Sequence, residues 1–303
     1  MMRKSVFLKS TLLIALLLPA TVDAQALKPP GRATGSLKVV TGHAGSVVFI
    51  NNIRHGHTTD AGELSLASVK AGTYPVRVRT VGFVDWKGSV VIAPSASRTL
   101  KVTHQPTTDE AVLHYQRGDA LRDKGKYAES VKEYEQAIRL KPVFPEARIA
   151  AARSYVALQE FDKGEAHLFA AMKASRTPLA EAQTVLGNLR RNQGFVDESI
   201  IEYRKALRLA RNVSPEAHIG LAIALEESNQ PEEAIKEYRI GIAQDMDTEP
   251  ILYYLLASIL EKNERKQEAI EAYQSYLRLD PEGQYATAVA SIIDRLKEEI
   301  DNQ

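Results

Sequence analysis

The chain has 303 residues, of which 25% are charged, and its formal net charge is +1. This length is sufficient for two domains, and the near balance of charges gives no support for nucleic-acid binding. The chain contains no cysteine, which excludes disulfide bonds and an anchor on an acylated cysteine.

Residues 1–24 have the pattern of an export signal. Arg3 and Lys4 form a basic start, and the apolar run 11–20 that follows is short for a membrane span. Cleavage is predicted between Ala24 and Gln25. It removes three basic residues and one acidic residue and leaves 36 basic and 37 acidic residues. We therefore expect an exported protein of a bacterial envelope, in the periplasm or secreted, without a stable membrane span. An uncleaved membrane anchor is the alternative that the short run disfavours.

Residues 25–35 are rich in Pro and Gly, which predicts a flexible leader. From residue 36 to residue 104, apolar residues recur with a period of two, and predicted turns at 41–45, 51–56, 71–72, 82 and 93–95 separate them. Short strands at this spacing predict a small antiparallel β-sandwich. The alternating residues are Leu37 and Val39, Val48 and Ile50, Leu64 and Leu66, Tyr74, Val76 and Val78, Val90 and Ile92, and Leu100 and Val102.

This stretch resembles the PEGA domain family through several short motifs. The family pattern combines Gly-Ala-x-Val-x-Ile, an acid-glycine turn, Gly-x-Thr, Pro-Gly-x-(Tyr/His), Val-x-Val and Gly-(Tyr/Phe). The resemblance implies a β-sandwich found on exported and envelope proteins, without known catalysis. Asn51-Asn52 replaces the acid-glycine turn, and Ala71 replaces the proline. The matching residues are Gly45, Ser46, Val48, Ile50, Gly56, Thr58, Gly72, Tyr74, Val76, Val78, Gly82 and Phe83.

The pair His55 and His57, with Asp60 nearby, is the one cluster that suggests a metal site. A spacing of two could place both imidazoles on one side of a strand. Structural zinc uses four ligands and catalytic zinc uses three, so we interpret the cluster as a polar turn and predict no metal.

After a linker at residues 105–110, one pattern of small and large residues recurs five times. The blocks span residues 111–144, 145–179, 180–214, 215–249 and 250–282, and their starts are 34, 35, 35 and 35 residues apart. A fixed period of this size indicates stacked supersecondary units. Small residues occupy position 8 of each block, at Gly118, Ala152, Gly187, Ala222 and Ala257.

Each block is predicted to fold as two antiparallel helices. Small residues recur at positions 8, 20 and 27, large ones at positions 7, 11 and 24, and the sequence breaks near positions 14 to 17. This resembles the tetratricopeptide repeat (TPR) family, although the family's Trp at position 4 is absent from every block. Thr107 to Glu110 has capping-box spacing, and Ser214 before Pro215 predicts another helix start.

Residues 283–303 are predicted to form a final helix that covers the end of the solenoid. Tyr285, Val289, Ile293 and Leu296 recur on one helical face. The expected fold class is therefore α+β multidomain, with a small antiparallel β-sandwich followed by an all-α TPR-like solenoid and a capping helix.

A candidate binding surface follows from the same register. Positions 2, 5, 9 and 12 of each first helix form a stripe away from the packing residues, and the resemblance implies that this stripe lines a concave groove. Apolar anchors beside Arg and Asn suit an extended or helical peptide. The family's carboxylate-binding pattern is matched only by Asn188, so a C-terminal carboxylate is not the expected ligand. The candidate residues are Tyr115, Asp119, Arg122, Ile149, Arg153, Thr184, Asn188, Arg191, Ile219, Ile223 and Tyr254.

The sequence contains no nucleophile elbow, phosphate-binding glycine loop, zinc-protease signature or dinucleotide fingerprint. We therefore expect no enzyme activity and no cofactor, and an adaptor that binds a protein or peptide partner in the groove. Two alternatives stay open. The β domain could bind cell-wall or surface-layer material, with the repeats as spacer or oligomerisation element, or the protein could be a non-catalytic subunit of an envelope enzyme or secretion complex.

Overall fold

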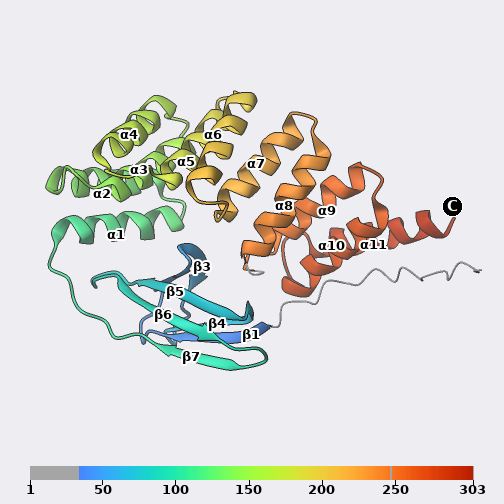
Figure 1. Cartoon of the computed structure of the whole chain (residues 1–303), viewed down its shortest axis with the longest axis horizontal. Helices are drawn as coiled ribbons and strands as arrows, with labels where there is room; N and C mark the ends of the chain where they lie inside the picture. The colour runs from blue at the N-terminus through green and yellow to red at the C-terminus, as the bar shows by residue number, and fades with distance from the viewer. Residues whose placement is uncertain (1–33, 246–247, 303) are drawn as a thin grey trace, which may run out of the picture. The chain divides into compact units, whose positions relative to one another are not determined.

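The computed structural model describes residues 34–245 and 248–302, so the predicted signal, its cleavage site at Ala24 and Gln25, and most of the leader lie outside the described residues. Seven strands are followed by eleven helices within this part of the chain (Figure 1). The fold class predicted from the sequence is confirmed. None of the described helices combines the length and apolar character needed to cross a membrane.

The β domain consists of two sheets with the strand orders β4-β1-β7 and β3-β2-β5-β6. The alternating residues of the sequence meet between the sheets, where Leu37, Val39, Val48 and Ile50 are at most 1% exposed. Every neighbouring pair is antiparallel except β1 and β7, which run parallel. The strands are β1 Thr34–Val40, β2 Val47–Ile50, β3 Ile53–His57, β4 Glu63–Lys70, β5 Gly72–Arg79, β6 Trp86–Ile92 and β7 Ser97–Lys101.

Strand β3 corrects the prediction of a turn from Asn51 to Gly56. The turn is only two residues long, and Asn51 and Asn52 both adopt positive φ angles of 53° and 63°. Asparagine tolerates this conformation, which suits the tight turn of a hairpin. The following residues therefore form strand β3, which pairs with β2 and adds one strand to the six predicted from the sequence.

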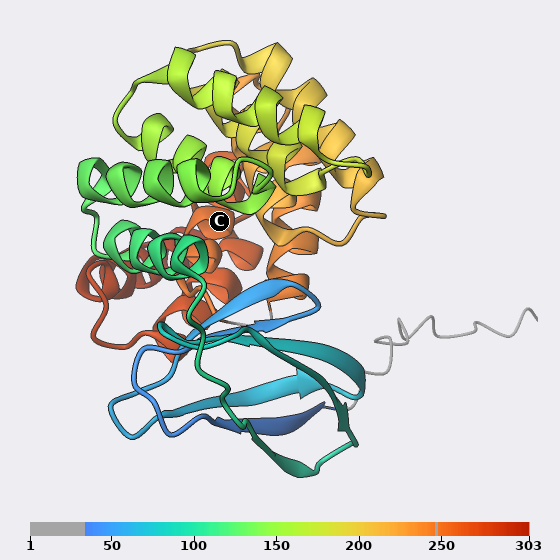
Figure 2. The ribbon, with the colours of Figure 1, turned by 90° about the vertical axis from the view of Figure 1, so that its left-hand side faces the viewer.

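The described helices are five consecutive pairs and one final helix. The two helices of a pair lie side by side (Figure 1 and Figure 2). Helix α1 begins within the predicted start, but its N-cap is Asp109 and not Thr107 of the predicted capping box. The Asp109 side chain accepts hydrogen bonds from the amides of Ala111 and Val112. Ser214 caps α7, as predicted. The helices are α1 Glu110–Asp123, α2 Tyr127–Leu140, α3 Pro145–Ala157, α4 Phe161–Ala174, α5 Ala180–Asn192, α6 Val196–Leu209, α7 Pro215–Glu227, α8 Pro231–Asp245, α9 Ile251–Lys262, α10 Lys266–Leu279 and α11 Ala286–Asp301.

Close approach of the two helices of a repeat explains the small residues. A Cβ atom added at Gly118 would lie 2.6 Å from the ring of Tyr134, and one added at Gly187 would lie 2.7 Å from Tyr203. Both tyrosines are completely buried. The tyrosine at position 24 therefore fills the space that the glycine at position 8 leaves open.

The missing tryptophan at position 4 is replaced in three repeats by a polar pair. His114 contacts Glu133 at 2.7 Å, His218 contacts Glu237 at 2.5 Å, and Gln183 bonds to Glu202. In each case position 4 of the first helix meets position 23 of the second helix. A hydrogen bond thus joins helices that the family usually joins through an apolar ring.

Helix α11 covers the end of the solenoid, as predicted. Val289 and Leu296 are at most 1% exposed and belong to the same apolar cluster as Tyr273 of α10. The last repeat therefore does not present its apolar face to water.

We expect Gly220→Ala to lower the free energy of unfolding by about 1–3 kcal/mol through overpacking. The new Cβ would lie 2.5 Å from Cε1 of Tyr203, which is fully buried and hydrogen-bonded to Asn188. The matched control is Gly164→Ala, where the nearest atom outside the helix is 3.4 Å away and alanine favours the helix. Urea unfolding should show a loss only for Gly220→Ala, and equal stability of the two variants would contradict this packing.

Candidate protein-binding groove

The candidate residues lie on the first helix of each repeat, namely α1, α3, α5, α7 and α9. Buried tyrosines of the second helices donate hydrogen bonds to two of them. The hydroxyl of Tyr134 donates to Asp119 at 2.8 Å, and that of Tyr203 donates to Asn188 at 2.6 Å. Burial raises the pKa of Tyr203 from 10 to about 12, so its hydroxyl stays protonated and able to donate well above neutral pH. The buried tyrosine hydroxyls thus fix the orientation of polar groove side chains in the first and third repeats.

Equivalent bonds occur in the last two repeats, shifted by one helical turn. Tyr238 donates to Glu226 at 3.4 Å, and Tyr273 donates to Glu261 at 2.8 Å. The acceptors occupy position 12 here and position 9 in the first and third repeats. The second repeat has Leu168 at the tyrosine position, and it is fully buried in the core of its repeat.

Charged side chains on neighbouring first helices pair with one another across the repeats. Arg191 contacts Glu227 at 3.0 Å, and Glu226 contacts Lys262 at 2.7 Å. Arg295 of α11 continues the series by pairing with Glu261. These partly exposed pairs contribute at most about 1 kcal/mol each, but they leave the groove nearly neutral.

Arg153 holds the centre of this series together. Its guanidinium donates to Glu216 at 2.8 Å and to Glu181 at 3.3 Å, and Asn188 also donates to Glu216 at 3.1 Å. Burial opposes the charged form of Glu216, but Arg153 outweighs it and lowers the pKa of the carboxyl. The second, third and fourth repeats are therefore linked through one carboxylate.

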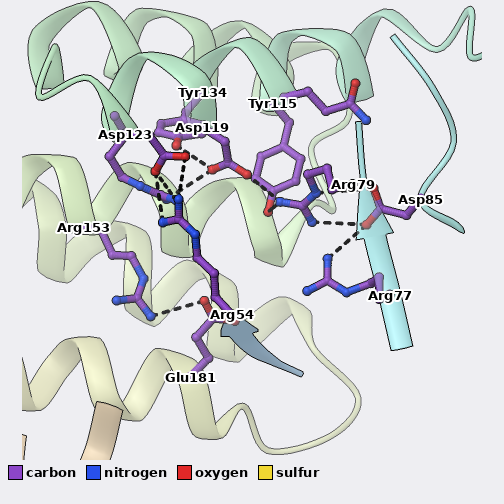
Figure 3. Close-up of polar contacts among 12 residues, drawn as sticks. Arg54, Arg77, Arg79, Asp85, Tyr115, Asp119, Asp123, Tyr134, Arg153 and Glu181 are labelled. Atoms are coloured by element: carbon purple, nitrogen blue, oxygen red, sulfur yellow. Dashed lines mark hydrogen bonds and ion pairs between the residues drawn. The ribbon is translucent and has the colours of Figure 1, made fainter. Parts of the chain in front are cut away.

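At the first repeat the partner of the groove residues is the β domain itself (Figure 3). Arg79 of β5 donates from Nη1 to the hydroxyl of Tyr115 at 2.7 Å and to Asp119 at 2.5 Å. Arg122 contacts the other oxygen of Asp119 at 3.1 Å. Tyr115 and Asp119, predicted as partner contacts, thus bind a residue of the same chain.

A second contact with the first repeat was not predicted. Arg54 of β3 forms two hydrogen bonds to Asp123, at 3.2 and 3.0 Å (Figure 3). His57 lies 3.2 Å from the same carboxylate. Asp123 lies one position beyond the predicted stripe, and Arg54 lies in the predicted turn. The pair Asn51-Asn52 between two apolar runs is the signal that could have revealed the hairpin.

Helix α1 also holds the loop that follows β5. Gln116 accepts a hydrogen bond from the amide of Gly82 at 2.9 Å and donates to the carbonyl of Phe83 at 2.8 Å. Its side-chain amide therefore accepts one hydrogen bond from the loop backbone and donates another to it, as a residue of a neighbouring β-strand does. Gln116 is 1% exposed, which makes this a buried and fully satisfied contact.

The candidate groove residues differ in exposure. Ile149 and Thr184 are 3% and 2% exposed, so the prediction that they line an accessible surface is wrong. Ile149 packs between the second and third repeats, and Thr184 donates to the carbonyl of Ala180. Ile219 and Ile223 are half-buried against the core, and so is Tyr254, which stacks on Tyr285 at 4.7 Å. The role of Arg122, Arg153, Asn188 and Arg191 in partner binding stays a prediction.

His55 and His57 point to different surroundings. The ladder slips between Val47 and Phe49 of β2, and Gly56 of β3 has a φ of 117°. This bulge brings His57 beside Arg54, whereas His55 is 3% exposed. Within the described ranges, no three His, Cys, Asp or Glu side chains are grouped so that they could hold a metal ion.

Comparison with known families agrees with this architecture. A TPR repeat model matches residues 118–159, a tetratricopeptide repeat model matches 184–248 and 219–284, and a PEGA domain model matches 34–107. A comparison with curated proteins gave no match.

Solved structures share the fold of the helical part. A thermophilic TPR protein of Thermus thermophilus is 17% identical with a TM-score of 0.52, and the match covers 60% of this chain and 98% of that one. PilF of Pseudomonas aeruginosa is 14% identical with a TM-score of 0.53, covering 63% and 86%. PilW, a type IV pilus biogenesis factor, is 16% identical with a TM-score of 0.52, covering 65% and 94%.

The fold therefore defines a helical-repeat protein with an additional β domain. More specifically, the chain is a tetratricopeptide repeat protein that carries an N-terminal PEGA domain.

Proposed function

We propose that this protein is a non-enzymatic adaptor of the bacterial envelope that binds a protein or peptide partner in the groove of its repeats. The observation that carries the proposal is the row of half-buried apolar side chains Ile219, Ile223 and Tyr254 on successive first helices. Apolar anchors with fixed polar neighbours are the usual features of a groove that takes a peptide.

The charges around this row indicate the chemistry of the partner. Glu226, Glu227 and Glu261 are each paired with a basic side chain of the chain itself. A strongly charged partner would have to compete with these pairs. We infer a partner segment that contributes apolar side chains and backbone hydrogen bonds rather than a formal charge.

The envelope location rests on the export pattern of residues 1–24 and on the PEGA domain, a type found on exported proteins. One structural neighbour, PilW, is a type IV pilus biogenesis factor, which supports an envelope role without naming a partner. The sequence contains none of the common catalytic signatures, which supports a role in binding rather than in chemistry.

Site-specific photo-cross-linking tests this proposal. A benzophenone amino acid is placed at Tyr254 in the groove and, as matched control, at Phe169 of α4, a ring that is 50% exposed on a second helix. After irradiation in an envelope extract, we expect a discrete adduct from position 254 only, identified by mass spectrometry.

Two isoleucine variants refine the test. Ile223→Asp should remove the adduct at position 254, whereas Ile201→Asp, at a position 60% exposed on α6, should leave it. Circular dichroism melting confirms that both variants remain folded. An adduct from position 169 alone would move the binding site to the second helices and contradict the groove proposal.

A further inference from the structure

The β domain contacts the solenoid at two places that are far apart in the sequence. The first is α1, which Arg54, His57 and Arg79 contact as described above. The second is the end of α8 in the fourth repeat, where Lys70 of β4 donates to the carbonyl of Ala243 at 3.2 Å. More than a hundred residues separate α1 from α8, so the β domain connects opposite parts of the repeat array.

Strand β3 contributes to both contacts. Arg54 is bonded to Asp123 of α1. Burial raises the pKa of Glu249, which precedes α9, and the positive charge of Arg54 opposes this rise. The backbone of Asp245, the last residue of α8, lies near the imidazole of the neighbouring His55. Two consecutive positions of β3 thus lie between the first repeat and the junction of the fourth and fifth repeats.

A repeat solenoid bends easily because most of its packing is between neighbouring units. A rigid domain bound at both the first and the fourth repeat restricts this bending. The contact at α1 is firm, because Arg79 and Asp119 are 12% and 11% exposed and Gln116 holds the loop backbone. The contact at α8 is weaker, because its hydrogen bond is exposed. The α8 contact is therefore the one that can open.

We propose that the PEGA domain is a brace that fixes the distance between the first and the fourth repeats, and that the groove changes its width only when β3 and β4 leave the α8 end. This rests on the proposed function only in treating the groove as the binding surface. The conformational role itself requires no partner. Binding a partner wider than the braced groove then requires release of the β3 and β4 contacts.

Distance measurements by double electron–electron resonance test the brace in the full chain. The protein has no cysteine, so spin labels can be placed cleanly at Lys132→Cys on α2 and Gln274→Cys on α10, both exposed positions. The brace is weakened at both of its contacts: Arg54→Ala removes the bonds to Asp123 of α1, and Lys70→Ala removes the bond to Ala243 of α8. The control is Lys87→Ala with Arg98→Ala, which removes the same charge from exposed residues of β6 and β7 that have no hydrogen bond or ion pair to the solenoid in the described part of the chain.

We expect the brace variant to shift and broaden the distance distribution, and the control to match the wild type. Hydrogen exchange of residues 47–58, measured on the same samples, should become faster only in the brace variant. If exchange of this segment is unchanged, the Arg54 and Lys70 contacts do not hold it, and the proposal is overturned. If exchange rises while the distances stay the same, the solenoid keeps its width unaided, and the proposal is overturned as well.

The outcome is independent of partner binding. A failed cross-link at Tyr254 with a positive distance result would remove the groove as a binding surface but keep the brace. The reverse result would keep the groove and remove the brace.

Discussion

Replacing Arg79 by alanine is expected to lower the free energy of unfolding by about 2–4 kcal/mol. The guanidinium pairs with Asp119 and Tyr115 in a nearly buried position, with only 12% of its side chain exposed. Loss of one member of a buried pair leaves the other charge poorly compensated. Asp119 retains Arg122 and the Tyr134 hydroxyl, which keeps the loss below that of a fully orphaned carboxylate.

The matched control is Arg77→Ala on the same strand. Arg79 and Arg77 both contact Asp85 of the β domain, at 3.3 and 3.0 Å. The guanidinium of Arg77 lies 3.7 Å from the centroid of the Phe49 ring, so the two partners of Arg77 belong to the β domain. We expect a loss of about 1 kcal/mol or less for this variant, because its ion pair is more exposed. Urea unfolding, together with hydrogen exchange of α1, measures the difference. Equal losses for the two variants would show that the contact with α1 adds nothing to stability.

The second large effect is a dependence of stability on pH through His55. Burial lowers the pKa of His55 from 6.5 to about 4, although the backbone of Ile50 and of Asp245 opposes this shift. In the described residues neither ring nitrogen has a hydrogen-bond partner. The charged groups near this part of β3 are Arg54 on the same strand and Asp245 and Glu249 between α8 and α9.

The direction follows from proton binding. Because the unfolded chain holds a proton on His55 below pH 6.5 and the folded chain does so only below about 4, the unfolded state binds more protons between these values. The contribution of His55 to the free energy of unfolding is therefore constant above pH 7. As the pH falls from 6.5 to 4, His55 progressively destabilises the folded protein. The full loss is about 3 kcal/mol, from about 1.4 kcal/mol for each pKa unit.

Comparison with His55→Leu isolates this contribution from the carboxylates that also titrate in acid. The free energy of unfolding of wild type and variant should converge, or reverse in favour of the variant, as the pH falls from 7 to 4.5. A constant difference across this range would mean that His55 has the same pKa in the folded and the unfolded protein, which contradicts the prediction. Leucine removes no hydrogen bond, because the imidazole makes none within the described chain.

Several parts of this structure follow from local sequence alone. The repeat period places a small residue against a ring in each repeat, and the contact of Gly187 with Tyr203 needs only the spacing of two neighbouring helices. The caps at Asp109 and Ser214 involve residues two or three positions apart. The apolar face of α11 and the alternation in Val76 and Val78 likewise depend on helix and strand periods.

Other parts depend on contacts between segments distant in the chain, which no local pattern specifies. The parallel pairing of β1 with β7 joins the two ends of the β domain. Ile149 lies on the predicted stripe, yet packing of the third repeat against the second buries it. The same reason applies to Arg54 and Arg79, whose solenoid partners are 69 and 40 residues away.

The sequence by itself determined the two domain types, the repeat period and the apolar positions of the groove, because these arise from side-chain spacing within one strand or one helical pair. Only the tertiary structure decided which groove residues remain accessible. Tyr115 and Asp119 match the pattern as well as Tyr254 does, but the docked β domain occupies them with Arg79. This contact joins β5 to α1, which no local pattern of the sequence brings together.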